Sequence, residues 1–168
     1  VNGDFSLSAS AVFNSTTAQL QIKNNFINSA IFNHNNGTVV FNGTASQIIS
    51  GSSPTTTFNH FTVNTGAVIT VSVSSPVRII GVLDILAGQL ITSDKVTLVS
   101  NLSGTAAIGD LTNAIASGTP PISGKMIIQR FVSGRNPGWK GLASPVTDAA
   151  FTDWKSEIFM TGYPGSHL

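Results

Sequence analysis

Cysteine is absent from this 168-residue chain, and charged side chains make up only 9% of it. Without cysteine, the chain has neither a disulfide framework nor a thiolate metal site. The formal net charge is +1, and the eight Lys and Arg residues are scattered rather than gathered in a basic stripe, which disfavours nucleic-acid binding. Intrinsic disorder is disfavoured too, because it usually combines low hydrophobicity with high net charge, whereas 41% of this chain is hydrophobic.

Long apolar runs are also missing. A membrane-spanning helix needs about 20 apolar residues in a row, and the uninterrupted apolar stretches here are only a few residues long. Helical bundles are disfavoured because long runs of Ala, Glu, Lys and Leu are lacking. No charged and then apolar signal segment follows Val1, which we expect to be the start of a processed or excised piece. The remaining class is a β-rich, weakly charged chain of extracellular character.

Short apolar triplets followed by Gly or Asn recur through the first two thirds of the chain. The triplets begin at Val39, Phe61, Leu83 and Ala106, which are almost evenly spaced. Two weaker sets recur at constant but slightly shorter intervals: Ile48, Ile69 and Leu90, and Phe58, Val77 and Val96. Three short strands in each turn of about 20–22 residues are typical of a β-solenoid. An ordinary β-sandwich, whose strands also recur at short intervals, is the alternative.

The composition changes near Gly109. The segment up to Gly109 carries six charged side chains, whereas the shorter segment after it carries nine, together with both tryptophans and the single tyrosine. We therefore expect solenoid repeats over residues 1–112, a linker rich in Ser, Gly, Thr and Pro over 113–124, and a truncated β-rich module over 125–168. Residues 1–38 are expected to form either the first coils or a cap over the open end of the stack.

Two segments carry a family resemblance. Residues 38–51 read TVVFNGTASQIISG and residues 81–100 read GVLDILAGQLITSDKVTLVS, which resembles repeat modules of large secreted proteins of the Bacteroidetes. The tail, from Met126–Phe131 to Asp153–Trp154, is similar to the segment that follows such repeats. The resemblance implies an all-β fold, a right-handed parallel β-helix followed by a small β-rich C-terminal unit. It also implies a cell-surface or extracellular protein that is exported by the type IX secretion system, with adhesin or stalk roles.

Catalytic constellations are hard to assemble from this sequence. Arg78 and Asp84 each lie between apolar neighbours and should point outward, where they could form a surface pair. Asp94 is most simply a polar corner, and His34, His60 and His167 have no metal-ligand spacing. Nucleophile-elbow, Walker and dinucleotide glycine motifs are absent. We therefore expect no enzyme activity, no catalytic residue, no metal and no cofactor.

The tail is the expected place for recognition. It brings cations and large aromatic side chains together in sequence: Arg130, Arg135, Trp139, Lys140 and Trp154. Exposed tryptophans can stack on sugar rings, and arginine can hydrogen-bond hydroxyls. The interpretation we favour over this one is that one or both tryptophans fill the core of a small β-module, as large apolar side chains usually do.

These observations favour a non-catalytic structural or adhesive module, a stalk or spacer, within a longer polypeptide. A carbohydrate-binding module is the alternative, and a filament-forming subunit or a polysaccharide-degrading β-helix enzyme is less favoured. The expected partners are surface glycans or other copies of the chain, besides the secretion machinery.

Overall fold

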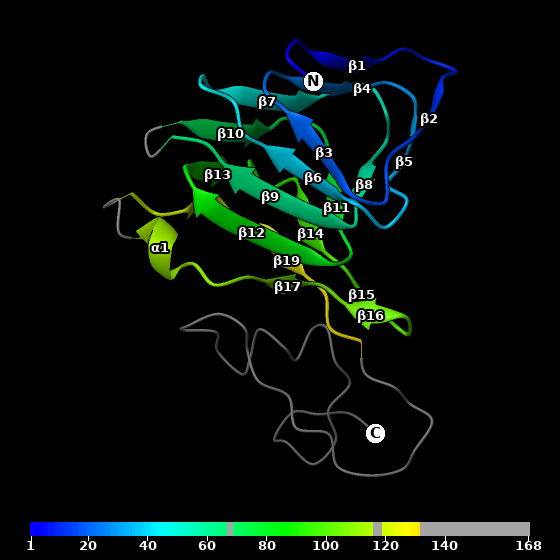
Figure 1. Cartoon of the computed structure of the whole chain (residues 1–168). Coiled ribbons are helices and arrows are strands. Elements are labelled where there is room, and N and C mark those ends of the chain that lie inside the picture. The colour runs from blue at the N-terminus through cyan, green and yellow to red at the C-terminus, as the bar shows by residue number, and fades with distance from the viewer. Residues whose placement is uncertain (67–68, 116–118, 132–168) are drawn as a thin grey trace, which may run out of the picture. The chain divides into compact units, whose positions relative to one another are not determined.

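The computed structural model describes residues 1–66, 69–115 and 119–131. In these residues the chain forms a parallel β-solenoid of about five turns, in which each coil contributes one strand to each of three sides (Figure 1). The all-β solenoid expected from the triplet repeat is confirmed. A single helical turn, α1 (Thr112–Ile115), lies between the last coils.

The first strands of successive coils form a parallel sheet, in the order β1 (Phe5–Leu7), β4 (Phe26–Asn28), β7 (Gln47–Ser50), β10 (Thr70–Val73), β13 (Gln89–Ile91) and β18 (Ile122–Ser123). The second strands of the later coils form another parallel sheet, which consists of β8 (Thr56–Phe58), β11 (Val77–Ile79), β14 (Val96–Leu98) and β19 (Met126–Ile128). In the first two coils the second strands, β2 (Val12–Asn14) and β5 (Ile31–Asn33), pair separately with each other. The third strands are β3 (Gln19–Ile22), β6 (Thr38–Phe41), β9 (His60–Asn64), β12 (Val82–Ala87) and β17 (Ala107–Ile108). Each strand presents alternate side chains to the interior.

The pairing register between coils confirms the main triplet repeat, but it differs in part from the two weaker sets of repeats. Val39 pairs with Phe61 and Phe61 with Leu83, which preserves the interval between the triplet starts. The next partner of Leu83 is Ile108, two residues beyond the triplet start expected at Ala106.

Both weaker sets depart from the expected partners. Val77 pairs with Val96 as expected, but Ile79 rather than Val77 is the partner of Phe58. Val71, not Ile69, is the partner of Leu90. Ile48 pairs with Ser72 and is 46% exposed, so it faces outward and does not belong to an inward column. A shift of two keeps the same face inward because side chains alternate with a period of two. An apolar pattern alone therefore does not separate the two registers.

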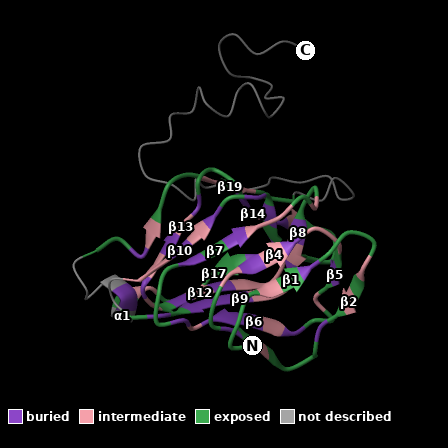
Figure 2. Ribbon diagram, turned by 90° about the horizontal axis from the view of Figure 1, so that it is seen from above, coloured by how far each residue is buried: buried purple, intermediate pink, exposed green. Residues whose placement is uncertain are grey.

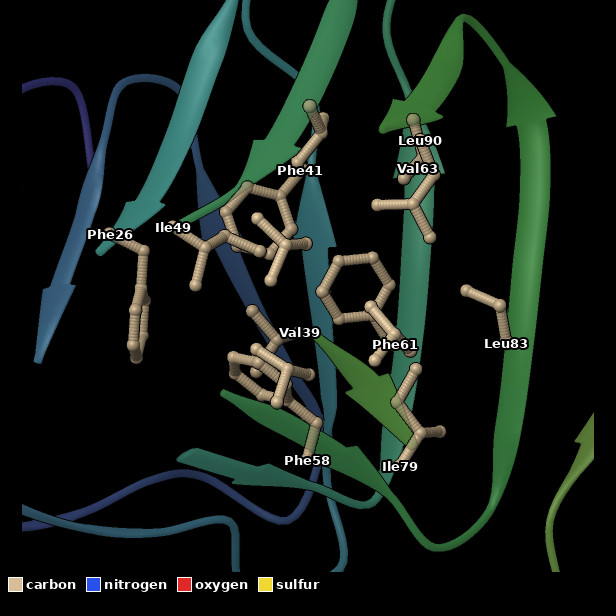
Figure 3. Packing of buried hydrophobic residues seen from close by; sticks show 14 of the residues in the cluster. Phe26, Val39, Phe41, Ile49, Phe58, Phe61, Val63, Ile79, Leu83 and Leu90 are labelled. Atoms are coloured by element: carbon tan, nitrogen blue, oxygen red, sulfur yellow. The ribbon is translucent and has the colours of Figure 1, made fainter. Parts of the chain in front are cut away.

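Phenylalanine fills the interior of the first three coils. The rings of Phe41 and Phe61 stack with centroids 5.1 Å apart (Figure 3), and those of Phe5 and Phe26 stack at the same distance. Phe58 is fully buried. The later coils use aliphatic side chains instead, namely Val71, Val73, Val77, Ile79, Leu83, Ile85 and Leu90. Figure 2 shows buried residues along the strands and exposed residues mainly in the connections.

Gln47 is an inward-facing polar residue at the start of β7, with only 1% of its surface exposed. Its Nε2 donates hydrogen bonds to the backbone oxygens of Ile22, at 3.0 Å, and Asn24. Its Oε1 accepts the backbone N–H of Gly43 at 2.9 Å. The side chain therefore joins the corner of its own coil to the corner of the coil before it, and its buried polar atoms are satisfied.

The last coils depart from the simple repeat. A hairpin of β15 (Ser100–Asn101) and β16 (Gly104–Thr105) is inserted between β14 and β17. Beyond α1, β18 pairs with β13 and β19 pairs with β14, both in parallel, so residues 122–128 belong to the sheets of the stack. These strands lie in the segments expected to be the linker and the start of a second module. The first compact unit extends to Ser133, and the second, Gly134–Leu168, lies outside the described residues.

Replacing Phe58 by Ala should lower the free energy of unfolding by about 3–5 kcal/mol, because it removes a large buried side chain. The Phe58 ring lies 5.3 Å from Phe61 and 5.4 Å from Phe26. Ile48→Ala is the control, since Ile48 is 46% exposed and its loss should cost about 1 kcal/mol or less. Urea denaturation measures both, and equal losses would contradict this description of the core.

Replacing Gln47 by Leu should destabilise the fold, although the change adds an apolar side chain to an interior column. It leaves the backbone oxygen of Asn24 and the N–H of Gly43 without this partner, whereas the oxygen of Ile22 keeps its hydrogen bond from the N–H of Asn42. Each buried unsatisfied group costs roughly 1–3 kcal/mol. Gln19→Leu on β3, a strand of another sheet, is the control, because Gln19 is exposed. A Gln47→Leu variant as stable as the parent in urea would disprove the bracing role.

Candidate functional site

A shallow cavity of about 190 Å³ lies against the inserted hairpin. It is lined by Asn59, Ile80, Val99, Asn101, Ser103 and Gly104. Three of these residues lie at the same corner of three successive coils, and the other three belong to the hairpin β15–β16. Residues far apart in the sequence are therefore brought together by the stacking of coils.

The corner that forms one wall is held by backbone hydrogen bonds between coils. The N–H of Ile80 donates to the oxygen of Phe58 at 3.1 Å, and the N–H of Val99 donates to Ile79 at 2.9 Å. The N–H of Ala106 then donates to the oxygen of Val99 at 2.8 Å, which closes the base of the hairpin. The hairpin, residues 100–105, is thus an insertion at a corner that earlier coils turn without one.

The lining combines amide and hydroxyl groups with two aliphatic side chains. Asn59 Nδ2 donates to the backbone oxygen of Asn36 at 2.8 Å, and Asn101 Oδ1 accepts the N–H of Ser103 at 2.8 Å. Val99 is only 3% exposed. No acidic, basic or histidine side chain is among the lining residues. The cavity can therefore hydrogen-bond and contact a small neutral ligand, but its lining side chains offer no general acid or base.

Arg130 is the one expected recognition residue within the described part of the chain. It is exposed and lies between two residues that contact the hairpin. The N–H of Phe131 donates to Ser100 Oγ at 2.9 Å, and Gln129 Oε1 accepts the N–H of Ser100 at 3.3 Å. The other expected residues, Arg135, Trp139, Lys140 and Trp154, lie outside the described residues.

Arg78 and Asp84 point outward as expected, but from different sheets. Arg78 is exposed on β11, whereas Asp84 is partly buried on β12, a strand of another side of the solenoid. The expected surface pair is therefore not formed. Asp94 is a polar corner as predicted, because its Oδ1 accepts the N–H of Lys125 from the next coil at 2.8 Å.

Each of the two described histidines accepts a hydrogen bond from a backbone N–H group. His60 Nδ1 accepts the N–H of Val82 at 3.1 Å, and His34 Nδ1 accepts the N–H of Asn36 at 3.0 Å. Partial burial of His34 lowers its pKa below the ordinary value of 6.5. His167 lies outside the described residues.

Asp110 caps the helical turn α1. Its carboxylate accepts hydrogen bonds from the side-chain hydroxyl and the backbone N–H of Thr112, and these bonds lower the pKa of Asp110. Asp110 is exposed. Within residues 1–66, 69–115 and 119–131, no cluster of three or more His, Cys, Asp or Glu side chains that could hold a metal ion occurs. The same residues contain no helix with the length and apolarity needed to cross a membrane.

No protein-family model, no curated protein and no solved structure matches this chain. The chemistry of the site is therefore interpreted from its own residues. The cavity residues Asn59, Asn101 and Ser103 were not among the expected site residues. The only sequence signal for them is the turn-forming segment Asn101–Gly104, which interrupts the repeat between Leu83 and Ala106.

Acidification should destabilise the fold partly through His34. The folded state disfavours the protonated imidazole, so the unfolded chain takes up this proton first as the pH falls below 6.5. In His34→Asn, the amide oxygen can accept the same Asn36 N–H without titrating. Urea denaturation at about pH 8 and about pH 5 should show similar stability at the higher pH and a smaller loss on acidification for the variant. An identical loss in both proteins would rule out this contribution.

Proposed function

We propose that this chain is a non-catalytic structural or adhesive module, a stalk or spacer, of a secreted or cell-surface protein. The observation that carries the proposal is the continuity of the parallel sheets from coil to coil. Each added coil extends such a stack by the separation of neighbouring strands, about 4.8 Å. A solenoid of this kind is suited to holding another part of a polypeptide at a fixed distance.

The use of polar groups supports the same proposal. Among the described residues, four titratable side chains are hydrogen-bonded to backbone N–H groups at or next to corners: His34, His60, Asp94 and Asp110. These hydrogen bonds stabilise the turns. None of these four side chains lines the cavity. A structural role accounts for them without a reaction.

A bacterial surface origin is the finer part of the proposal. It rests on the repeat motif that resembles secreted proteins of the Bacteroidetes and, through them, on type IX secretion. The Gln of that motif is Gln47 here, and its hydrogen bonds between two corners give the motif a structural reason. The motif is thus compatible with a repeated coil whose role is to pack on the coils before and after it.

Carbohydrate recognition is the second candidate, and the cavity is the observation that favours it. Asn59, Asn101 and Ser103 offer amide and hydroxyl groups above the aliphatic side chains of Ile80 and Val99. Sugars present hydroxyl groups and apolar C–H surfaces that match such a lining. The size of the cavity, about 190 Å³, suits a single sugar unit better than a chain held along its length.

A glycan screen of the full chain separates the two candidates. The spacer role predicts no saturable binding to soluble or insoluble glycans, measured by pull-down and tryptophan fluorescence, and no reducing ends released from polysaccharides. Saturable binding that free sugar competes away would overturn it. In that case, loss of binding in Asn101→Ala would assign the cavity, whereas loss in Trp139→Ala or Trp154→Ala, with Asn101→Ala unaffected, would assign the tail. Arg78→Ala, on another part of the surface, is the matched control.

A further inference from the structure

The basic side chains of the described residues gather on one side of the solenoid. Of the five Lys and Arg residues in 1–66, 69–115 and 119–131, four lie in or next to the sheet β8–β11–β14–β19: Arg78, Lys95, Lys125 and Arg130. The fifth, Lys23, lies between β3 and β4. Charges that are far apart in the sequence are thus brought to one surface by the stacking of successive coils (Figure 1).

The pairing register places these side chains on the outer face of the sheet. Arg78 pairs with Thr97 and Thr97 with Ile127, so the three form one outward column. Lys95 and Lys125 each stand two residues before a member of this column, and a spacing of two keeps side chains on the same face of a strand. All three basic side chains are exposed. We call Arg78, Lys95, Lys125 and Ile127 the basic face.

Two of these cations occupy equivalent positions in neighbouring strands. Lys95 and Lys125 directly precede the paired residues Val96 and Met126, and neighbouring strands lie about 4.8 Å apart. Like charges directly opposite each other in a sheet are destabilising. The placement is therefore unfavourable for the fold alone, and an anionic surface against it would offset the repulsion.

Acidic side chains of the described residues do not balance this charge. Asp4 precedes β1 and Asp84 lies on β12, both in other sheets, and Asp110 caps α1. Asp94 adjoins the basic face, where its Oδ1 accepts the backbone N–H of Lys125 at 2.8 Å. Within the described part of the chain, no hydrogen bond or ion pair engages the three basic side chains of the face. The face therefore carries an excess of positive charge.

An exposed apolar side chain lies among these cations. Ile127, in the column of Arg78, is 60% exposed, and Phe131, four residues later, is 49% exposed. The other members of the column, Thr57 and Thr97, have short side chains. Cations beside exposed apolar groups are typical of surfaces that bind a lipid interface, because cations attract anionic headgroups and apolar groups enter between them. A soluble acidic polymer would engage the cations but gives Ile127 no role.

We propose that the basic face docks on an anionic lipid surface. Arg78, Lys95 and Lys125 contact the headgroup phosphates, and the side chain of Ile127 enters the headgroup region. The attraction acts only within about a Debye length of the lipid surface, so it requires the cations to lie together on one face, as they do here. The inference goes beyond the proposed spacer role and does not rest on it, because it concerns one side of the stack and not its length or its cavity.

Co-sedimentation of the full chain with phosphatidylcholine vesicles, with and without phosphatidylglycerol, tests the proposal. We expect binding only when phosphatidylglycerol is present, and weaker binding in high salt. Lys125→Gln should weaken the binding about fivefold, as expected for one basic residue near an anionic membrane surface. Lys23→Gln is the matched control, because it removes the same charge from another part of the stack, and it should bind like the parent chain.

A second variant, Ile127→Ser, separates a lipid surface from a soluble anionic polymer. It should weaken vesicle binding severalfold without changing its salt dependence, because it removes an apolar contact and no charge. Binding to soluble polyglutamate should be absent or much weaker than binding to the vesicles. Urea denaturation should show Lys125→Gln and Ile127→Ser to be about as stable as the parent, because both positions are exposed.

Four outcomes would overturn the proposal. The first is the absence of a preference for vesicles that contain phosphatidylglycerol. The second is equal weakening by Lys125→Gln and Lys23→Gln, which would mean that only net charge is recognised. The third is vesicle binding unaffected by Ile127→Ser together with equally strong binding to polyglutamate, which would assign the face to an acidic polymer. The fourth is slower chemical acylation of Lys95 and Lys125 than of Lys23 in the free chain, which would mean that the protein itself covers the face.

Discussion

The parallel hydrogen-bond ladder between consecutive coils is the constraint on which the rest of this structure depends. It places each residue directly over its partner in the next coil, so an inward position forms a column and not an isolated contact. Phe41 over Val63 and Val77 over Val96 are two such columns. A polar residue in a column must find its partners within the stack, as Gln47 does with the corner of the preceding coil.

The same constraint explains how the surface is used. Corners carry most of the polar side chains, and many of these bond to backbone groups of a neighbouring coil. Asp94, for example, bonds to Lys125 and Asn59 to Asn36. Where a coil is regular, few polar side chains remain available to bind a ligand. The cavity arises where this regularity breaks, at the inserted hairpin.

Much of the fold could be predicted because the pattern is local and repeated. Val39, Phe61 and Leu83 each begin an apolar triplet before a turn, and the structure pairs them in that order. The shifted partners, such as Ile79 for Phe58, could not be predicted, because a shift of two residues buries the same face. The position of Asn59 beside Asn101 could not be predicted either, since it depends on the number of residues in each intervening corner.

The sequence by itself determined the class of architecture: alternating apolar residues, turn-forming Gly and Asn, and an evenly recurring triplet specify stacked short strands. It also determined the weak charge, which disfavours a nucleic-acid partner. Only the tertiary structure decided which residues share a column, that residues 122–128 join the stack, and which side chains meet at the cavity. The physical reason is that strand alternation and turn preference are local, whereas register is set by hydrogen bonds between residues a whole coil apart in the sequence.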